Sequence, residues 1–251
     1  MSPEGTVELE RHDGVAVVRL VDRERRNALS LPMVGAIVAA FDELERDDAI
    51  GAVVVTGEPP AFCSGADTPS LGRLASTDDA AERGSIVTVY DAFLRVLGSP
   101  LPTIAAVDGA AVGAGFNLAL ACDLRLVGPN ARFDSRFLRI GLHPGGGHLW
   151  MLERAVGPQA AAACVLFGER IDAARAIELG LAWSSHPAAD LLGAAIALGS
   201  KAASAPKPLV ARTKASLRSA PWQPDFEAAI DTELEAQTWS LAQGYFSRPG
   251  S

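Results

Sequence analysis

The sequence predicts an α/β fold, because apolar, β-branched runs alternate along the chain with segments of helical periodicity. Two glycine-bearing stretches support this prediction: AFCSGAD at 61–67 and DGAAVGAGFNLALACD at 108–123. Each follows a strand-like run, 53–55 in the first case and 104–107 in the second. Each stretch is therefore expected to form a tight turn after a strand, and such a turn presents backbone N–H groups.

The composition is that of a globular protein. The chain length corresponds to one large domain, or to about one and a half domains of average size. The chain has 251 residues, of which 49% are hydrophobic and 21% are charged, so it can bury a sizeable core. Its 30 acidic and 22 basic residues give a net charge of −8. This acidic balance disfavours nucleic acid or an anionic membrane as a partner.

The three cysteines, Cys63, Cys122 and Cys164, show no spacing typical of metal ligands. We expect them to be free thiols in a reducing cytoplasm, and we expect no bound metal. Residues 1–13 contain five charged residues and no apolar run, so no signal peptide is expected. The apolar stretch 109–122 is too short to span a bilayer and is expected to be a buried helix.

The first half of the chain carries local signals for a hairpin, two helices and three strands. Alternating runs at 6–10 and 15–21, joined by His-Asp-Gly, predict a β-hairpin. Ser30 as an N-cap and Pro32 in the first turn predict a helix, with apolar residues at helical spacing up to Leu44. Further elements are expected in this order: a strand at 50–56, a strand at 104–107, a helix that reaches 122, and a strand at 123–127.

The second half is predicted to be mainly helical. Asp172 is expected to cap a helix that ends at Gly180. From about Pro187 the chain is alanine-rich, and later prolines divide it into three helices. Earlier in the chain, the polar residues 68–84 are expected to be a mobile surface segment.

Four motifs in order resemble one enzyme family. The two glycine-bearing stretches, together with ERRNALS at 24–30 and GLHPGGG at 141–147, are similar to the enoyl-CoA hydratase/isomerase family, or crotonase superfamily. The resemblance implies a crotonase-like ββα superhelix at 1–195 and a C-terminal helical trimerisation region at 196–251. It also implies an enzyme that is a homotrimer or a dimer of trimers. Its substrate is an acyl-CoA thioester, with coenzyme A as part of the substrate and no separate cofactor.

The resemblance places the two N–H groups of an oxyanion hole at Ala66 and Ala114. The second lies in Gly113-Ala114-Gly115, where the family commonly has three glycines. An alanine keeps its N–H group, so the hole can form, and each such donor contributes about 2.7–4 kcal/mol in enzymes that stabilise an oxyanion. The alternative is that both turns only connect strands to helices.

A basic cluster is the candidate for binding the phosphates of coenzyme A. Arg23, Arg25 and Arg26 form this cluster, and Lys207 and Lys214 on the late helices are further candidates. The alternative is a solvated basic turn. The resemblance places other residues beside the substrate: Ala28, Cys63, Ser64, Asp67, Thr68 and Gly113, of which Asp67 could equally form a local turn.

The expected catalytic acid and base are missing. The family's hydratases hold water between two glutamates, and alignment of the motifs puts Asn117 and Phe137 at these positions. Neither side chain transfers a proton near neutral pH, and such a group contributes about 10²–10⁴ in rate. We therefore expect slow hydration and an acyl-CoA reaction through an enolate, with isomerisation, decarboxylation and thioester hydrolysis left open. The alternative is a non-catalytic acyl-CoA carrier or sensor on the same fold.

Two nearby titratable residues are further catalytic candidates. His143 could act as an acid or base near neutral pH, or it could only hydrogen-bond a backbone carbonyl in a Pro-Gly turn. Asp134 could take part in catalysis or form an ion pair with Arg136 or Arg139. The sequence favours the structural role in both cases. The same segment holds Ser135 and His148, but no Ser-His-Asp order is recognisable.

Overall fold

Two β-sheets share the strands of the chain in the computed structural model, which describes residues 5–66 and 80–247. The larger sheet has the order β1-β2-β3-β5-β7-β10 and the smaller one β4-β6-β8-β9. The strands of the larger sheet are β1 (Thr6–His12), β2 (Val15–Val21), β3 (Ala52–Gly57), β5 (Thr103–Val107), β7 (Leu124–Val127) and β10 (Ser184–Ser185). Those of the smaller sheet are β4 (Ala61–Cys63), β6 (Ala110–Val112), β8 (Arg132–Asp134) and β9 (Ile171–Asp172).

The strands are mostly parallel, and successive units of chain contribute one strand to each sheet. Among the described strands, only the β1–β2 hairpin and the β8–β9 pair are antiparallel. A helix follows each pair of strands, as in β3-β4-α3, β5-β6-α4 and β7-β8-α5. This repeat is the ββα superhelix that the resemblance implied. The helices are α1 (Leu31–Arg46), α3 (Ala80–Gly98), α4 (Ala114–Ala121), α5 (His148–Leu166), α6 (Ala173–Glu178), α7 (Leu191–Ala203), α8 (Lys207–Ser219) and α9 (Phe226–Ala242).

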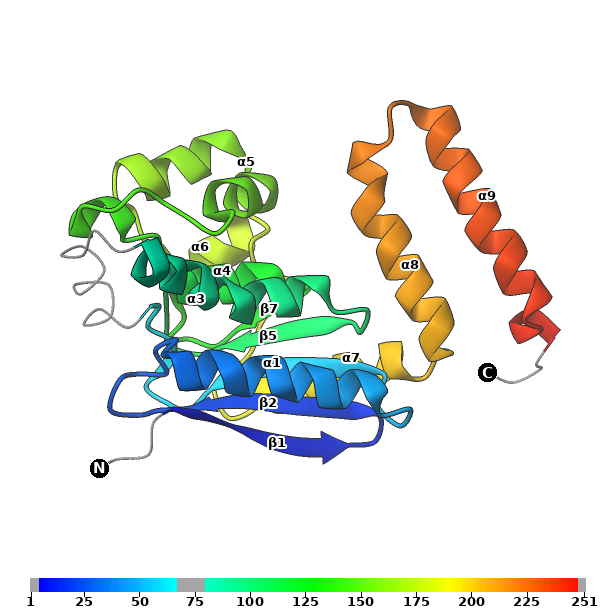
Figure 1. Ribbon diagram of the computed structural model, residues 1–251, viewed down its shortest axis with the longest axis horizontal. Helices are drawn as coiled ribbons and strands as arrows, with labels where there is room; N and C mark the ends of the chain where they lie inside the picture. The colour runs from blue at the N-terminus through cyan, green and yellow to red at the C-terminus, as the bar shows by residue number, and fades with distance from the viewer. Residues whose placement is uncertain (1–4, 67–79, 248–251) are drawn as a thin grey trace.

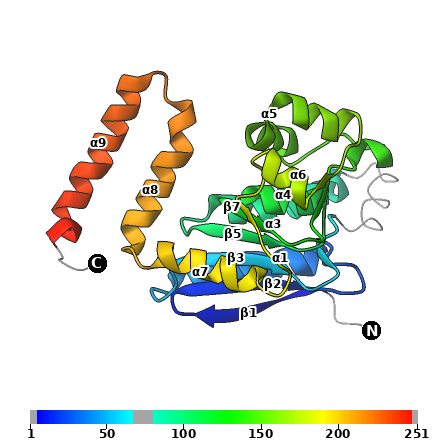
Figure 2. The same cartoon turned by 180° about the vertical axis from the view of Figure 1, so that it is seen from behind.

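The larger sheet is covered on both faces, as Figures 1 and 2 show from opposite sides. Because side chains alternate along a strand, Val53 and Val55 pack in the main core with α1. The intervening Val54 packs with Leu191 and Ala195 of α7 in a second cluster. The near-continuous apolar sequence of β3 is therefore explained by burial of both of its faces.

The elements predicted from short sequence signals, such as caps and alternating runs, are confirmed. The hairpin, the helix α1 and the strands β3, β5 and β7 lie where they were expected. The side chain of Ser30 accepts a hydrogen bond from the N–H group of Met33, and that of Asp172 accepts one from Arg175. The last three predicted helices are α7, α8 and α9.

Two expectations are corrected. The stretch 109–122 is not one helix, because 110–112 form β6 and α4 begins only at Ala114, after the turn at Gly113. Most of the surface segment expected at 68–84 lies outside the described residues, but its end belongs to α3, which begins at Ala80. Within the described ranges, no helix is long and apolar enough to cross a membrane, and no cluster of His, Cys, Asp or Glu could hold a metal ion.

The helical hairpin of α8 and α9 projects from one end of the sheets (Figure 1). Helix α7 crosses the boundary drawn at 195/196, and its residues Leu191, Ala195 and Gly199 are buried against the larger sheet. The chain therefore leaves the core after α7, at about residues 204–206. In contrast, α9 has no buried residue and packs on α8.

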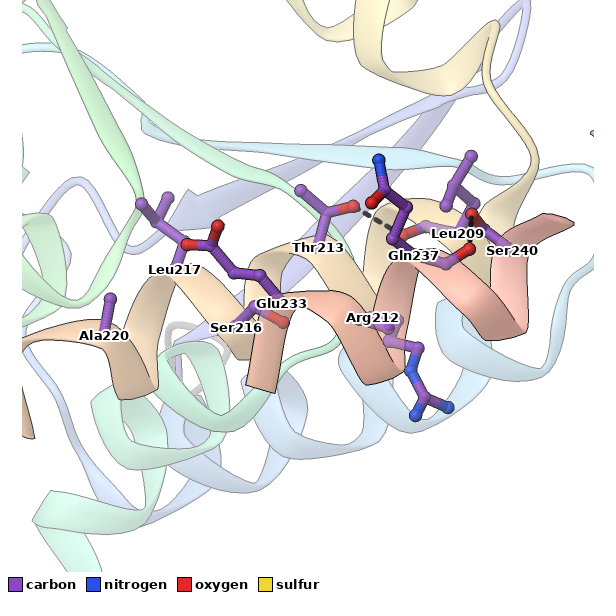
Figure 3. Close-up of a pocket in the computed structure, with 10 residues that line it drawn as sticks. Leu209, Arg212, Thr213, Ser216, Leu217, Ala220, Glu233, Gln237 and Ser240 are labelled. Atoms are coloured by element: carbon purple, nitrogen blue, oxygen red, sulfur yellow. Dashed lines mark hydrogen bonds between the residues drawn. The ribbon is translucent and has the colours of Figure 1, made fainter. Parts of the chain in front are cut away.

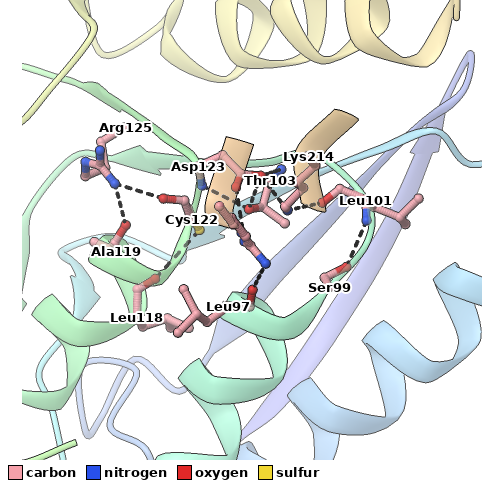
Figure 4. Close-up of polar contacts among 11 residues, drawn as sticks. Leu97, Ser99, Leu101, Thr103, Leu118, Ala119, Cys122, Asp123, Arg125 and Lys214 are labelled. Carbon is pink, nitrogen blue, oxygen red and sulfur yellow. Dashed lines mark hydrogen bonds and ion pairs between the residues drawn. The ribbon is translucent and has the colours of Figure 1, made fainter. Parts of the chain in front are cut away.

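A polar cluster around Asp123 fastens α8 to the core (Figure 4). Its carboxylate accepts hydrogen bonds from both the N–H and the hydroxyl group of Thr103, and it pairs with Lys214 and Arg218 of α8. Lys214 also donates to the carbonyl of Leu101. Burial lowers the pKa of the Lys214 ammonium, and the neighbouring Asp123 carboxylate opposes this shift.

The two late lysines are therefore not available to coenzyme A phosphates within this chain. Lys214 is 7% exposed and pairs with Asp123. Lys207 donates to the carbonyls of Glu45 and Asp47 and so caps the C-terminus of α1. Both lysines hold the C-terminal hairpin in place.

Candidate active site

The two glycine-bearing turns lie against each other. Gly65 has φ +98°, and a Cβ atom added to it would lie 2.5 Å from the carbonyl oxygen of Val112 and 3.6 Å from the nitrogen of Ala114. A Cβ atom on Gly115 would lie 2.1 Å from the carbonyl oxygen of Cys63. Only glycine permits this approach, so these residues bring the two turns together.

Ala66 and Ala114, which follow the two turns, line one cavity. Ala114 is the first residue of α4, where N–H groups have no partner inside the helix and the helix dipole is positive. In the part of the chain that the structure describes, neither amide donates a hydrogen bond. Two free backbone donors at a cavity wall form a suitable site for a negatively charged oxygen.

The cavity has a volume of about 530 Å³, which lies in the range typical of small-molecule sites. One wall is apolar and comes from α3 and from the segment that contains η1 (Phe137–Ile140). This wall consists of Val89, Tyr90, Phe137, Ile140 and Leu142. Polar groups are few and converge from other elements: Arg25, Ser64, Asn117, Ser135, Arg136 and His143.

A chain of buried hydrogen bonds joins two of these polar residues. The Asn117 side-chain oxygen lies 2.7 Å from Nδ1 of His148, and Nε2 of His148 lies 2.7 Å from Oγ of Ser135. The Nδ2 group of Asn117 donates to the carbonyl of Gly145 at 3.0 Å. Because that carbonyl only accepts, the orientation of the Asn117 amide is assigned from the hydrogen-bond pattern, with its oxygen toward His148.

This orientation determines the tautomer of His148. An amide oxygen only accepts, so Nδ1 of His148 carries the proton, and Nε2 accepts the hydroxyl hydrogen of Ser135. His148 is 1% exposed and lies against two aromatic rings. Its ring centroid lies 5.4 Å from that of Phe116 and 5.0 Å from that of Phe137. Burial in these surroundings lowers the pKa of His148 to about 4, so its imidazole is neutral at physiological pH.

The positions that resembling hydratases fill with glutamate lie at this site. Asn117 and Phe137 both line the cavity, and Phe137 lies beside Gly113. No aspartate or glutamate is among the described residues of the lining. Both ends of the Asn117 side chain are engaged, so this residue supports the network around His148.

The two other catalytic candidates have structural contacts. Asp134 does not line the cavity, and its carboxylate pairs with Arg139 and Arg170. The expected ion pair with Arg139 is confirmed, and the catalytic placement of Asp134 is corrected. His143 lines the cavity, but its Nδ1 lies 2.7 Å from the carbonyl of Pro144, which is the backbone hydrogen bond expected as its structural role.

The predicted coenzyme A residues divide into two groups. Arg25, Ala28, Ser64 and Gly113 line the cavity. Arg26 and Cys63 do not: Arg26 has φ 54° and its carbonyl accepts from the N–H of Ser64, and Cys63 is fully buried under Gly115. Burial also raises the pKa of the Cys63 thiol to about 12. The predicted residues Asp67 and Thr68 lie outside the described residues.

Sequence reasoning did not recognise the connection between Ser135, His148 and Asn117. The three residues occur in the order Asn-Ser-His, which matches no short motif. The three residues are far apart in the sequence. They come together in space because β6 pairs with β8 and because of the turn that precedes α5. No local pattern reports such a contact.

Comparison with known proteins identifies the family. A family model described as Enoyl-CoA hydratase/isomerase matches residues 10–243. A protein of Mycobacterium tuberculosis named "Probable enoyl-CoA hydratase EchA14" is 49% identical over 205 residues, which are 82% of this chain and 78% of the relative.

Solved structures show the same fold. An enoyl-CoA hydratase from Polaromonas sp. JS666 matches with a TM-score of 0.88 at 30% identity, over 94% of this chain and 91% of the other. An enoyl-CoA hydratase from Bacillus anthracis matches with a TM-score of 0.84 at 27% identity, over 93% of this chain and 90% of the other. This chain is therefore a crotonase-fold member of the enoyl-CoA hydratase/isomerase family of acyl-CoA enzymes.

Proposed function

We propose that this chain binds an acyl-CoA thioester with its carbonyl oxygen between the N–H groups of Ala66 and Ala114. The observation that carries the proposal is the contact of the two glycine-bearing turns, which brings Ala66 and Ala114 to one cavity, with neither amide donating a hydrogen bond to a described residue. These donors would stabilise the negative charge that develops on the oxygen as an enolate or a tetrahedral intermediate forms. A structure with bound acyl-CoA tests this directly, and an oxygen beyond hydrogen-bond distance from both amides would contradict it.

Hydration of crotonyl-CoA is expected to be slow, far below the common enzyme rate of about 10 per second. The reason is that no carboxylate is among the described lining residues and that Asn117 is held at both ends. The loss of enoyl absorbance measures the rate, with a hydratase that has both glutamates as the positive control. A rate of about 10 per second or more would show that another group activates the water.

Arg25 is the expected phosphate contact of coenzyme A, and Arg26 provides a matched control. Arg25 lines the cavity and its side chain is about half exposed; among the described residues, its guanidinium makes one ion pair, a long 3.8 Å contact to Asp22. We expect Arg25→Glu to weaken acyl-CoA binding by roughly tenfold, more at low salt, because Coulomb attraction to the phosphates becomes repulsion. Arg26→Glu should have a smaller effect. Calorimetric titration with acyl-CoA measures both, and equal effects of the two variants would place the phosphates elsewhere.

A non-catalytic acyl-CoA carrier or sensor is the second candidate. It is favoured by the lack of a carboxylate among the described lining residues. Turnover of a panel of acyl-CoAs, compared with their binding, separates the two functions. Binding without any turnover would support the carrier.

We also propose that the chain assembles as a homotrimer or a dimer of trimers through α8 and α9. The proposal is supported by an exposed apolar stripe on α9 at helical spacing: Phe226, Ile230, Leu234 and Leu241. A groove of about 360 Å³ opens between the two helices (Figure 3). Its lining comes from Leu209, Thr213 and Leu217 of α8 and from Glu233, Gln237 and Ser240 of α9. A second copy that covers this surface would remove the apolar stripe from water.

Ile230→Glu with Leu234→Glu is expected to shift the protein to smaller species at micromolar concentration. Burying two charges at an apolar interface costs more free energy than the contact returns. Sedimentation velocity measures the change. Asp231→Lys is the control, because it alters charge about 100° around the same helix and should leave the assembly intact. An unmodified chain that sediments as a monomer would contradict the proposal.

A further inference from the structure

We propose that Ser135, His148 and Asn117 form a nucleophile–base–orienting triad, and that the chain hydrolyses its acyl-CoA through an acyl-serine intermediate. The inference rests on the proposed function, since it uses the same cavity and the same two amide donors. It adds the reaction and the residue that carries the acyl group.

The hydrogen bonds have the direction that this chemistry needs. Ser135 Oγ–H points to Nε2 of His148 at 2.7 Å, and Nδ1–H of His148 points to the amide oxygen of Asn117 at 2.7 Å. The bond from Asn117 Nδ2 to the Gly145 carbonyl prevents the amide from turning over. An asparagine in this place orients the base in Cys-His-Asn proteases, where the roles are the same.

Ser135 is a buried residue of the cavity wall, 2% exposed. It lies between the end of β8 and the start of η1 and lines the cavity. Its carbonyl oxygen lies 3.8 Å from the place of a Cβ atom on Gly113, next to the proposed donor at Ala114. The following residue, Arg136, has φ 56°, an uncommon conformation for a side chain of this size. Such strain is often found where a turn presents a reactive group.

The reaction balances with water as the only co-reactant. Ser135 Oγ attacks the thioester carbon and its proton passes to Nε2 of His148, while the amides of Ala66 and Ala114 hold the oxyanion. The C–S bond then breaks and the leaving sulfur takes the proton from His148. Water attacks the acyl-serine ester and gives a proton to Nε2, and that proton returns to Ser135 Oγ as the carboxylic acid leaves.

The surroundings of His148 keep its imidazole neutral at rest, but the burial that lowers its pKa also disfavours the imidazolium that forms when it takes the serine proton. His148 lies between aromatic rings and is neutral at physiological pH, so Nε2 is free to accept. Asn117 is uncharged, and it therefore stabilises the imidazolium less than a carboxylate would. We expect a serine enzyme of modest rate with a preference for the apolar acyl groups that fit against Tyr90, Phe137 and Leu142.

An alkyl fluorophosphonate tests the nucleophile without coenzyme A. Incubation of the full chain, followed by tryptic mass spectrometry, is expected to place the adduct on Ser135. Ser135→Ala should lose the adduct, and its release of thiol from acetyl-, crotonyl- and octanoyl-CoA should fall at least about 100-fold. Ser135→Cys should still form an acyl adduct, which a purely structural hydroxyl would not explain.

Ser184 provides a matched control, because its Oγ lies 2.9 Å from Nε2 of His186 but it does not line the cavity. Ser184→Ala should keep the adduct on Ser135. A fluorophosphonate adduct elsewhere, or thiol release that Ser135→Ala leaves unchanged, would overturn the triad. If acyl-CoA fails to bind in calorimetry, the proposed function fails, and the labelling result still decides the triad.

Discussion

Ala114→Pro is expected to reduce acyl-CoA turnover by about 10²–10³-fold without unfolding the protein. The substitution deletes the N–H group of Ala114, one of the two proposed donors to the substrate oxygen. Proline is well tolerated at the first position of a helix, where no N–H is needed inside the helix, and Ala114 occupies that position in α4. The preceding Gly113 accepts the restriction that a proline places on its neighbour.

Steady-state kinetics on the best acyl-CoA substrate measure this effect, and thermal unfolding checks the fold. Ala173→Pro is the matched control, since Ala173 is the first residue of α6 and does not line the cavity. That variant should retain its activity. A fall in kcat/KM of less than about tenfold for Ala114→Pro would remove Ala114 from the oxyanion hole.

Asp123→Ala is expected to lower the free energy of unfolding by about 3–5 kcal/mol, the largest effect on stability that we predict. The carboxylate joins Thr103 of β5 to Lys214 and Arg218 of α8 (Figure 4). Its removal leaves a nearly buried ammonium without its partner. Since burial already lowers the pKa of Lys214, release of its proton limits the cost.

A double-mutant cycle separates the pair from the other contacts of Asp123. Lys214→Met removes the buried charge and leaves Asp123 paired with Arg218, so it should cost less than Asp123→Ala. In the double variant the loss should be smaller than the sum of the two single losses. Urea unfolding of the four proteins measures these values. Additive losses would show that the two side chains do not stabilise each other.

Much of the fold could be predicted because its signals are local. Ser30 and Pro32 start α1, and Asp172 caps α6, through contacts within one helical turn. The strands of the smaller sheet were not recognised as such, since they have only two or three residues each and no visible periodicity. The expected domain boundary at 195/196 falls inside α7. The sequence does not show this, because an alanine-rich helix has the same pattern whether it packs on a sheet or belongs to a projecting hairpin.

The sequence predicted the two backbone turns of the candidate site. It predicted less well which side chains line the site. The glycines near Ala66 and Ala114 indicate close approach, and the structure places the two turns in contact. Lys214 was a binding candidate because of its charge, and Cys63 because of its position. In the structure Lys214 pairs with Asp123, and Cys63 is fully buried. Burial and ion pairing depend on residues distant in the chain, so sequence order does not reveal them.

The sequence by itself determined the α/β class, the family, the two glycine-bearing turns and the lack of a carboxylate at Asn117 and Phe137, because these are properties of single residues and short motifs. Only the tertiary structure decided which polar side chains meet at the cavity. The hydrogen bonds of His148 reach Ser135 and Asn117, which are 13 and 31 residues away along the chain. Those contacts exist because β6 pairs with β8 and the following turn directs α5 back over α4.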